Sequence, residues 1–331
     1  MYNTLTVDKY SDLTEEQWDT YFNFRLLLDE QINSQTAYKS LVELQNKMAF
    51  TFNDTNRLII IRDDHKFIAI IWLTRKKKVD FENARLDLTF GSLLYDIPLD
   101  IVDLIKKSIL EFKQDNEPVY FQTSSFKYVE LVKSLSGKLF NDALSFKLNL
   151  EDIDWENINQ WYQTGKSNKD ISLRLFKGLP KNKKLAQELL ALWEMVDRDI
   201  PNSENYYDFF SNRGYIDESL SYAKENGGID YFYTLFAKKD HKMIGLTHVS
   251  FYPQKSGYAG QSISGVIPEF RNHGLGKYLK AVMLKRLIKD FPKELKGVRT
   301  GVSKNNHAIL KITKQMGFRF QGNRLSYKLD I

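Results

Sequence analysis

The same order of strand-like and helix-like segments occurs twice in this chain of 331 residues. In each half, a hairpin of two short apolar strands around a charged turn leads into a strand, a helix, a strand, a helix and a final strand. The length is more than one ordinary domain needs and fits two copies of about 150 residues each. The repeated order therefore predicts a duplicated α+β fold.

The predicted elements define the two halves. The first half is expected to contain a helix at 15–28, strands at 57–61, 67–73 and 84–94, a helix at 99–112, a strand at 119–122, a helix at 128–135 and a strand at 143–150. The second half is expected to contain a strand at 171–176, a helix at 181–196, strands at 231–238, 243–251 and 260–266, a helix at 275–289, a strand at 298–302, a helix at 308–316 and a strand or hairpin at 318–329. The expected domains are residues 1–155 and 165–331. The polar connection between them carries Trp155 and Trp161, which favours a packed connection over a loose one.

Composition excludes several classes of protein. Hydrophobic residues make up 42% of the chain and charged residues 27%, which is enough apolar material for folded cores and excludes wholesale disorder. Cysteine is absent, which excludes disulfides and thiolate metal sites and favours a reducing compartment. The N-terminal segment lacks the regions of a signal peptide, and no apolar run is long enough to span a bilayer. We therefore expect a cytoplasmic protein without membrane contact.

The net charge of +6 leaves three explanations open, namely nucleic-acid binding, an anionic cofactor and a generally soluble surface. The basic clusters at 75–78 and 181–184 are not interleaved with aromatic residues as a single-strand binding platform would be. They are interpreted as solvated surface, and no nucleic-acid partner is expected. No pairing of the five histidines has metal-ligand spacing, so no metal site is predicted.

One turn between a predicted strand and a predicted helix is typical of an anion site. It runs Asn272-His273-Gly274-Leu275-Gly276. At a helix N-terminus the first four N–H groups lack intrahelical partners and the helix dipole is positive, so a diphosphate is a natural occupant. Glycine lets the backbone approach such a ligand closely.

Nearby cations fit the same interpretation. Lys277 and Lys280 add positive charge, and Arg271 could either order the loop or pair with phosphate. The alternative is a tight turn that needs two glycines for backbone reasons alone. The turn is not a P-loop, because Tyr278 follows Gly276 and Lys277, and it lacks the third glycine of the dinucleotide fingerprint.

Two blocks of sequence resemble the GNAT superfamily of N-acetyltransferases. The first is Val266-x-Pro268-x-x-Arg271-x-x-Gly274-x-Gly276, which resembles the acetyl-CoA signature of that family. The second is Asn306-x-x-Ile309-Leu310-x-Ile312-x-x-x-Met316-Gly317-Phe318, which resembles a later segment of the family. The resemblance covers residues 165–331 and reaches the first half only through the repeated order of elements. The chain resembles tandem GNAT proteins, the group that includes mycothiol synthase, and this resemblance concerns the architecture and not the substrate.

The resemblance implies two tandem GNAT-like domains, each with a mixed, mostly antiparallel sheet flanked by helices, and acetyl-CoA as the cofactor. The residues that it places at the cofactor are Val266, Ile267, Arg271, Asn272, His273, Gly274, Leu275, Gly276, Lys277 and Asn306. Backbone amides of the loop would hold the diphosphate, while the strand backbone and the asparagine amide would meet the pantetheine arm. The first half lacks the arginine and the glycine pair after its corresponding strand, so it is expected to be a degenerate copy that walls the substrate pocket or stabilises the other half.

Acetyl transfer to an amine needs a base that leaves the amine neutral. Glu269 is one candidate, with a solvated turn residue as the alternative. His248 is another, with a structural histidine as the alternative. Asp199 could bind a cationic amine or cap the turn before Pro201.

The reaction also needs an oxyanion donor and an acid for the leaving thiolate. The resemblance places the donor on the strand backbone near Val266. Thr313 stands where many family members have the tyrosine that serves as the acid. Tyr258 and Tyr278 are therefore candidate acids by their nearness in the sequence.

The expected function is acetyl-CoA-dependent transfer of an acetyl group to a primary amine of a small molecule, by a monomer or homodimer. The alternative is a non-catalytic CoA-binding sensor or scaffold protein, which Thr313 favours. Aromatic residues in the segment 201–228 favour a ring-bearing or apolar acceptor.

Overall fold

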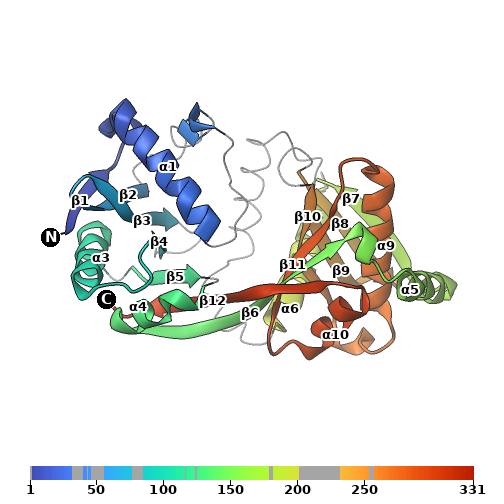
Figure 1. Cartoon of the computed structure of the whole chain (residues 1–331). Helices are drawn as coiled ribbons and strands as arrows, with labels where there is room; N and C mark the ends of the chain where they lie inside the picture. Colours follow the sequence, from blue (N-terminus) through green and yellow to red (C-terminus); the bar gives the residue numbers. More distant parts are fainter. Residues whose placement is uncertain are drawn as a thin grey trace. The chain divides into compact units, whose positions relative to one another are not determined.

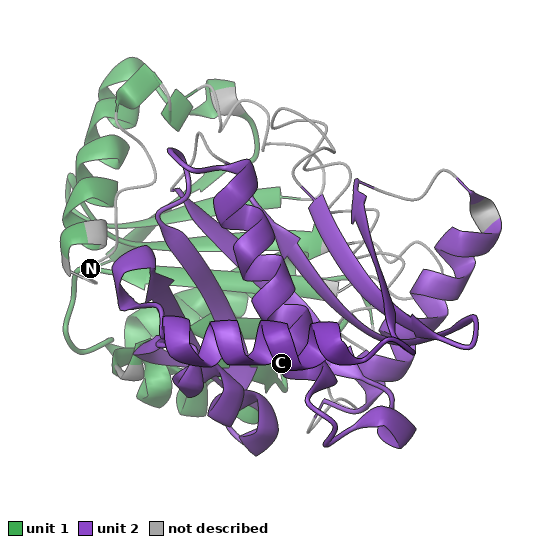
Figure 2. Cartoon of the chain, turned by 90° about the vertical axis from the view of Figure 1, so that its right-hand side faces the viewer, with its two compact units in different colours: residues 1–140, 324–331 green, residues 141–323 purple. Residues whose placement is uncertain are grey.

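The computed structural model describes residues 2–31, 40–42, 44–45, 56–76, 85–115, 117–123, 125–178, 182–200, 232–252 and 257–331. The chain forms two compact units, shown in separate colours in Figure 2. Unit 1 consists of Met1–Phe140 and Arg324–Ile331, and unit 2 of Asn141–Asn323. The first boundary between the units lies inside strand β6 (Gly137–Asn149), and the second lies inside β12 (Arg319–Leu329). These boundaries differ from those of the expected domains, 1–155 and 165–331.

Unit 1 is a mixed sheet with helices on both faces (Figure 1). The described strands lie in the order β1-β2-β3-β4-β5-β12, and among them only the β4–β5 pair is parallel. Its other elements are β1 (Tyr2–Val7), α1 (Glu15–Gln31), β2 (Asn56–Asp63), β3 (Lys66–Lys76), β4 (Arg85–Ser92), α3 (Leu99–Phe112), β5 (Val119–Thr123), the 3-10 turn η2 (Phe126–Tyr128) and α4 (Val129–Ser134). The apolar run of β2 serves both faces, because Leu58 and Ile60 join the core of α1 while Ile59 and Ile61 join the core of α3.

Unit 2 repeats this plan with the strand order β6-β11-β10-β9-β8-β7. Of the strand pairs in the described part of this unit, only β10–β11 is parallel. Its other elements are α5 (Trp155–Ser167), β7 (Ser172–Lys177), α6 (Lys183–Arg198), β8 (Phe232–Lys239), β9 (Lys242–Ser250), β10 (Tyr258–Val266), the 3-10 turn η5 (Pro268–Phe270), α9 (Leu275–Asp290), β11 (Gly297–Ser303) and α10 (His307–Gln315). The α+β class and the mostly antiparallel sheets are as the sequence predicts.

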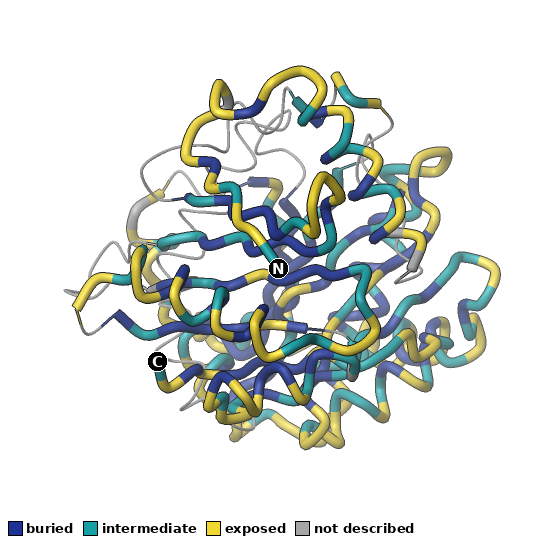
Figure 3. The backbone as a smooth tube through the Cα atoms, turned by 60° about the vertical axis from the view of Figure 1, so that its left-hand side comes forward, coloured by how far each residue is buried: buried dark blue, intermediate teal, exposed yellow. Residues whose placement is uncertain are grey.

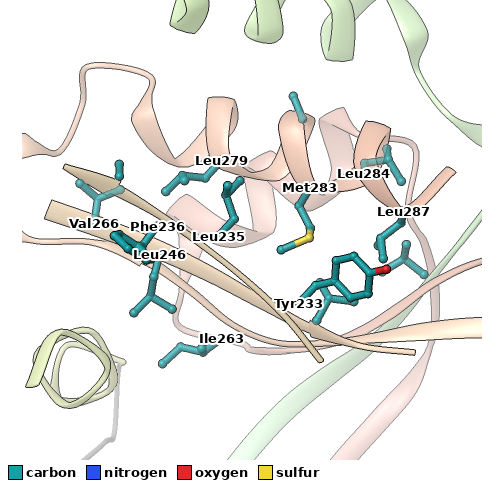
Figure 4. Packing of buried hydrophobic residues seen from close by; sticks show 14 of the residues in the cluster. Tyr233, Leu235, Phe236, Leu246, Ile263, Val266, Leu279, Met283, Leu284 and Leu287 are labelled. Atoms are coloured by element: carbon teal, nitrogen blue, oxygen red, sulfur yellow. The ribbon is translucent and has the colours of Figure 1, made fainter. Parts of the chain in front are cut away.

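Helices α9 and α6 cover opposite faces of the unit 2 sheet. Leu279 and Met283 of α9 pack on one face together with Leu235, while Ile263 lies on the other (Figure 4). Helix α6 approaches β10 so closely that a Cβ on Gly265 would lie 2.2 Å from Val196 Cγ1. Buried and exposed residues alternate along the helices, whereas much of each central strand is buried (Figure 3).

The connection predicted between the halves contains a helix that the sequence analysis does not predict. Helix α5 begins at an N-cap, where the carboxylate of Asp154 accepts the N–H of Asn157 at 3.0 Å. Ile158 and Trp161 are buried, and Trp155 is 42% exposed. The packed connection that the tryptophans predict is therefore confirmed for Trp161.

Within the described part of the chain, no helix has both the length and the apolar character that a membrane crossing requires.

Candidate active site

The candidate site begins where β10 and β11 separate. The two strands pair in parallel over four residues, from Tyr258 with Gly297 to Gln261 with Thr300. At the last pair, Thr300 Oγ1 donates to the carbonyl of Gln261 at 3.2 Å. The register between β9 and β10 shifts after Gln261, and such a bulge bends the strand. Residues 262–266 of β10 therefore form one side of a fork whose other side is β11.

Arg271 closes the loop that follows β10. Its Nε donates to the carbonyl of Val266 at 2.8 Å, and its Nη2 pairs with the carboxylate of Asp199 at the end of α6. Of the two roles left open by the sequence, this arrangement favours the ordering of the loop. It also assigns Asp199 to an ion pair, and it engages the Val266 carbonyl that the resemblance offers to a pantetheine arm.

The turn before α9 exposes its backbone. Residues 271–274 are all exposed. Asn272 has φ 65° and Gly274, the N-cap of α9, has φ 78°, and both values lie in the left-handed region. The carbonyl of Gly274 accepts the N–H of Tyr278 at 3.0 Å, so the N–H groups of residues 275–277 precede the first intrahelical hydrogen bond.

Gly276 separates the ligand explanation from the tight-turn explanation. It lies inside the helix, and a Cβ there would meet only Val266 Cγ2, at an ordinary 3.8 Å. Glycine in a helix is about 1 kcal/mol less favourable than alanine. Because internal packing does not require this glycine, the space beside it is available to a ligand, and the residues present fit a bound diphosphate.

The remaining predicted cofactor residues surround this loop with different degrees of access. Ile267 and Leu275 are buried and anchor the loop in the core, while His273 is exposed. The ammonium of Lys277 lies 5.0 Å from the centre of the Trp161 ring. Asn306 caps α10, its Oδ1 accepting the N–H of Ile309 at 3.2 Å, and this cap does not involve its Nδ2.

His248 lies in an aromatic core beneath α6. Its Nδ1 is 2.8 Å from Thr234 Oγ1, and its ring centre lies 5.0 Å from Trp193 and 5.4 Å from Phe232. Desolvation lowers the pKa of this imidazole to about 4. The surroundings therefore favour the structural histidine over the catalytic base.

Neither candidate tyrosine has its ring at the glycine loop. Tyr258 is the first residue of β10 and Val266 the last, so about 26 Å of strand separates them at the usual rise per residue. The Tyr258 hydroxyl donates to Asn149 at 2.9 Å. The Tyr278 ring packs on α5, where a Cβ on Gly165 would lie 2.0 Å from it. Nearness in the sequence is a poor guide here because a strand carries its first residue away from its last.

Two carboxylates lie near the ends of the elements that meet at the loop. Glu269 is exposed in η5, directly after β10. Asp197 lies in the last turn of α6, next to Val196, which packs against Gly265 of β10. Desolvation raises the pKa of Asp197 to about 6. The sequence analysis does not single out Asp197, although its place after the apolar face of a predicted helix is a signal that could have done so.

A buried polar network joins α9 to the fork. Lys280, which is 3% exposed, donates to Gln261 Oε1 at 2.5 Å. Gln261 Nε2 donates to Thr247 Oγ1 at 3.1 Å, and that hydroxyl lies 2.5 Å from Ser264 Oγ. Desolvation lowers the pKa of Lys280 to about 7. The sequence suggests Lys280 only as positive charge near the loop, and the structure encloses its ammonium in the core.

Thr313 is 1% exposed, and its hydroxyl has no hydrogen-bond partner within the described residues. In the same residues, no group of three or more histidine or acidic side chains could hold a metal ion. The aromatic segment 201–228 lies outside the described residues.

Comparison with known proteins identifies the fold. No family model and no curated protein matches the chain. Among solved structures, a tandem GNAT protein from the clavulanic acid biosynthesis pathway, in a form without acetyl-CoA, matches with a TM-score of 0.64 at 14% identity, over 99% of this chain and 98% of its own. A GCN5-related N-acetyltransferase from Sphaerobacter thermophilus matches with a TM-score of 0.63 at 10% identity, over 99% and 95%.

A third match is the GCN5-related glucosamine N-acetyltransferase region of a fungal multi-domain GH3 β-N-acetylglucosaminidase. Its TM-score is 0.61 at 11% identity, over 99% of this chain and 38% of that protein. At such low sequence identities these matches show similarity of fold alone. Along almost its whole length, the chain has the fold of the tandem GNAT proteins.

Proposed function

We propose that this protein is an acetyl-CoA-dependent N-acetyltransferase that acts on a primary amine of a small molecule. The observation that carries the proposal is the fork between β10 and β11, which leads directly to the exposed N-terminus of α9. Gly276 leaves that N-terminus uncovered, although internal packing does not require a glycine at this position. Two of the similar structures are described as GCN5-related N-acetyltransferases or regions of that kind, which supports the assignment.

Each part of the site has a task in this reaction. The N–H groups of residues 275–277 bind the diphosphate of the cofactor, and Arg271 holds the loop in the required shape. When bound, acetyl-CoA supplies an activated acetyl thioester. The strand segment 262–266, whose pairing with β11 has ended, would line the arm and supply N–H donors to the carbonyl oxygen as negative charge develops there.

A carboxylate takes the proton that the acceptor amine loses. Asp197 and Glu269 are the candidates, because both lie where α6 and the end of β10 meet the loop. The carboxylate would accept the proton that the amine nitrogen loses, bound acetyl-CoA would supply the acetyl group, and the departing thiolate would take up a proton. A base with a pKa near 6 is unprotonated at neutral pH and suits this task.

The alternative is a CoA-binding sensor or scaffold protein. The observation in its favour is Thr313, whose short, buried side chain cannot replace a tyrosine hydroxyl as an acid. This alternative keeps the cofactor loop and removes the chemistry.

Two measurements test the proposal in sequence. Calorimetry of the full chain with acetyl-CoA should show saturable binding, and no binding at millimolar cofactor would refute both the enzyme and the sensor. Release of CoA thiol is then followed while a panel of small primary amines is offered. Thiol release that depends on one amine class supports the transferase, whereas binding without turnover across the panel supports the sensor.

A further inference from the structure

Unit 1 contains a fork of the same design as the one in unit 2. Strand β4 pairs in parallel with β5 over only three residues, from Leu86 with Val119 to Leu88 with Phe121. The end of β4 can be matched to the end of β10, because the N–H of Leu93 donates to Ile68 as the N–H of Ile267 donates to Ile244. Ser92 in unit 1 is therefore the counterpart of Val266 in unit 2.

Side chains of unit 1 bridge this fork. The N–H of Ser92 donates to the hydroxyl oxygen of Tyr128 at 3.1 Å. Lys127 Nζ donates to the carbonyl of Ser92 at 2.8 Å. Both side chains come from η2, which follows β5 on the opposite side of the fork. Both backbone groups of Ser92 are thus bonded across the gap.

The ring of Tyr128 packs against both sides of the fork. Its centre lies 5.4 Å from Phe90 of β4 and 6.4 Å from Phe121 of β5, edge-on to each ring. Tyr128 is 5% exposed and Ser92 is fully buried. Burial raises the pKa of Tyr128 and lowers that of Lys127, as expected for groups enclosed by the fold.

The matching position in unit 2 is arranged differently. The Val266 carbonyl is bonded by Arg271, which belongs to the same side of the fork. The segment after β11 leads to Asn306, whose side chain caps α10. In the described part of unit 2, no side chain from the β11 side bonds the backbone of Val266. One fork is therefore closed by its own chain, and the other is not.

We infer that Tyr128 and Lys127 occupy in unit 1 the place that an acyl carrier's arm takes in unit 2, so that the protein binds one carrier molecule per chain, and binds it in unit 2. This inference deepens the proposed function and rests on it for the carrier. The loop after β4 agrees, because α3 begins at Leu99 with Pro98 as its N-cap, and residues 93–98 contain no glycine. Unit 1 is then a support whose fork stays shut without a ligand.

The first experiment measures stoichiometry and location together. Calorimetry of the full chain with acetyl-CoA should give one site, and hydrogen exchange should show new protection at 258–280 and none at 85–92 or 119–128. Two sites per chain, or protection in the unit 1 segments, would overturn the inference. If acetyl-CoA does not bind at all, the proposed function is refuted. The second experiment then tests separately whether the fork of unit 1 is closed.

The second experiment needs no cofactor. Tyr128→Phe keeps the ring but removes the acceptor of the Ser92 N–H, so hydrogen exchange in a peptide covering 89–93 should become roughly tenfold faster. Lys127→Met should accelerate exchange in the same peptide by removing the second bond. Tyr120→Phe, which alters a buried tyrosine of β5 instead, should leave it unchanged. Equal exchange in Tyr128→Phe and the unaltered protein would show that the fork is not bridged.

Discussion

Gly274 and Gly276 lie two residues apart at the start of α9, but different causes act on them. Gly274 has a left-handed backbone, which disfavours other residues whether or not a ligand binds. Gly276 has helical geometry and open space around it. Only Gly276 therefore reports on the ligand, and substitutions there separate binding from folding.

Gly276→Glu should abolish acetyl-CoA binding while the protein remains folded. The carboxylate would stand near the place proposed for the diphosphate, and the new Cβ would meet only Val266 Cγ2, at 3.8 Å. We expect a loss of at least about 100-fold in affinity by calorimetry, since two like charges in contact cost several kcal/mol. The melting temperature should not fall, because glycine is a poor helix former.

Lys184→Glu is the matched control for this change. Lys184 is also the second residue of its helix, α6, and it is exposed. It should leave acetyl-CoA affinity unchanged. Retention of full affinity by Gly276→Glu would contradict the placement of the diphosphate.

Asp197→Asn tests the base at the end of α6. Activity of the unaltered enzyme should rise with pH through about 6, as the Asp197 carboxyl loses its proton. The variant should lose roughly 100-fold or more in kcat, the usual size of general-base catalysis, and should lack that limb of the pH–rate profile. Glu269→Gln is the comparison variant, and a profile that keeps its acid limb in Asp197→Asn but loses it in Glu269→Gln would reassign the base.

At the scale of elements, α9 is held to the sheet by apolar packing and by one buried ammonium. In the described residues no carboxylate pairs with Lys280. Its ammonium donates to the side-chain amide of Gln261, which in turn donates to the hydroxyl of Thr247. A buried charge with so little compensation costs stability. The network links α9 to the fork at a cost in stability.

Lys280→Met should stabilise the protein at neutral pH by a few kcal/mol, because it removes the buried charge and keeps the length of the side chain. The pKa of Lys280 lies near 7 in the folded protein, against an ordinary value of 10.5, so the unfolded chain binds the extra proton between these limits. Stability of the unaltered protein should therefore rise as the pH rises from about 7 towards 10.5, and that rise should be missing in the variant. Denaturant unfolding at several pH values measures both effects, and an unchanged slope in Lys280→Met would disprove the assignment.

The sequence predicts elements best where a periodic apolar pattern is long. Strand β10, helix α9 and the turn between them are where the pattern at 260–289 places them. Helix α5 escapes prediction because most of its residues are polar and only two of them, Ile158 and Trp161, are buried. Tertiary contacts also determine the ion pair of Arg271 with Asp199, whose partners are far apart in the sequence.

At the scale of the whole molecule, each unit is completed by a strand from the other half of the sequence. Residues 325–329 of β12 pair with β5 in unit 1, and residues 143–149 of β6 pair with β11 in unit 2. Leu325, Tyr327 and Leu329 are buried in the core of unit 1. Neither half of the sequence therefore contains a complete unit.

A chain that ends at residue 323 should have a destabilised unit 1, although it keeps residues 1–140. Burial of each large apolar side chain contributes about 1.5–3 kcal/mol, so the loss of three such residues is comparable to the stability of a small domain. Hydrogen exchange should show lost protection in β4 and β5, and a synthetic peptide covering 319–331 should restore part of it. Full protection of β4 and β5 in the shortened chain would contradict the requirement of unit 1 for β12.

The contribution of β12 to unit 1 also determines when that unit can be finished in the cell. A ribosome builds the chain from its first residue and covers the most recent residues in its tunnel, and N-terminal domains ordinarily fold while synthesis continues. Here the strand that completes the earlier unit is made only after the residues of unit 2, 141–323. The N-terminal unit must therefore wait, with β5 lacking its partner strand, until the residues of unit 2 have been synthesised.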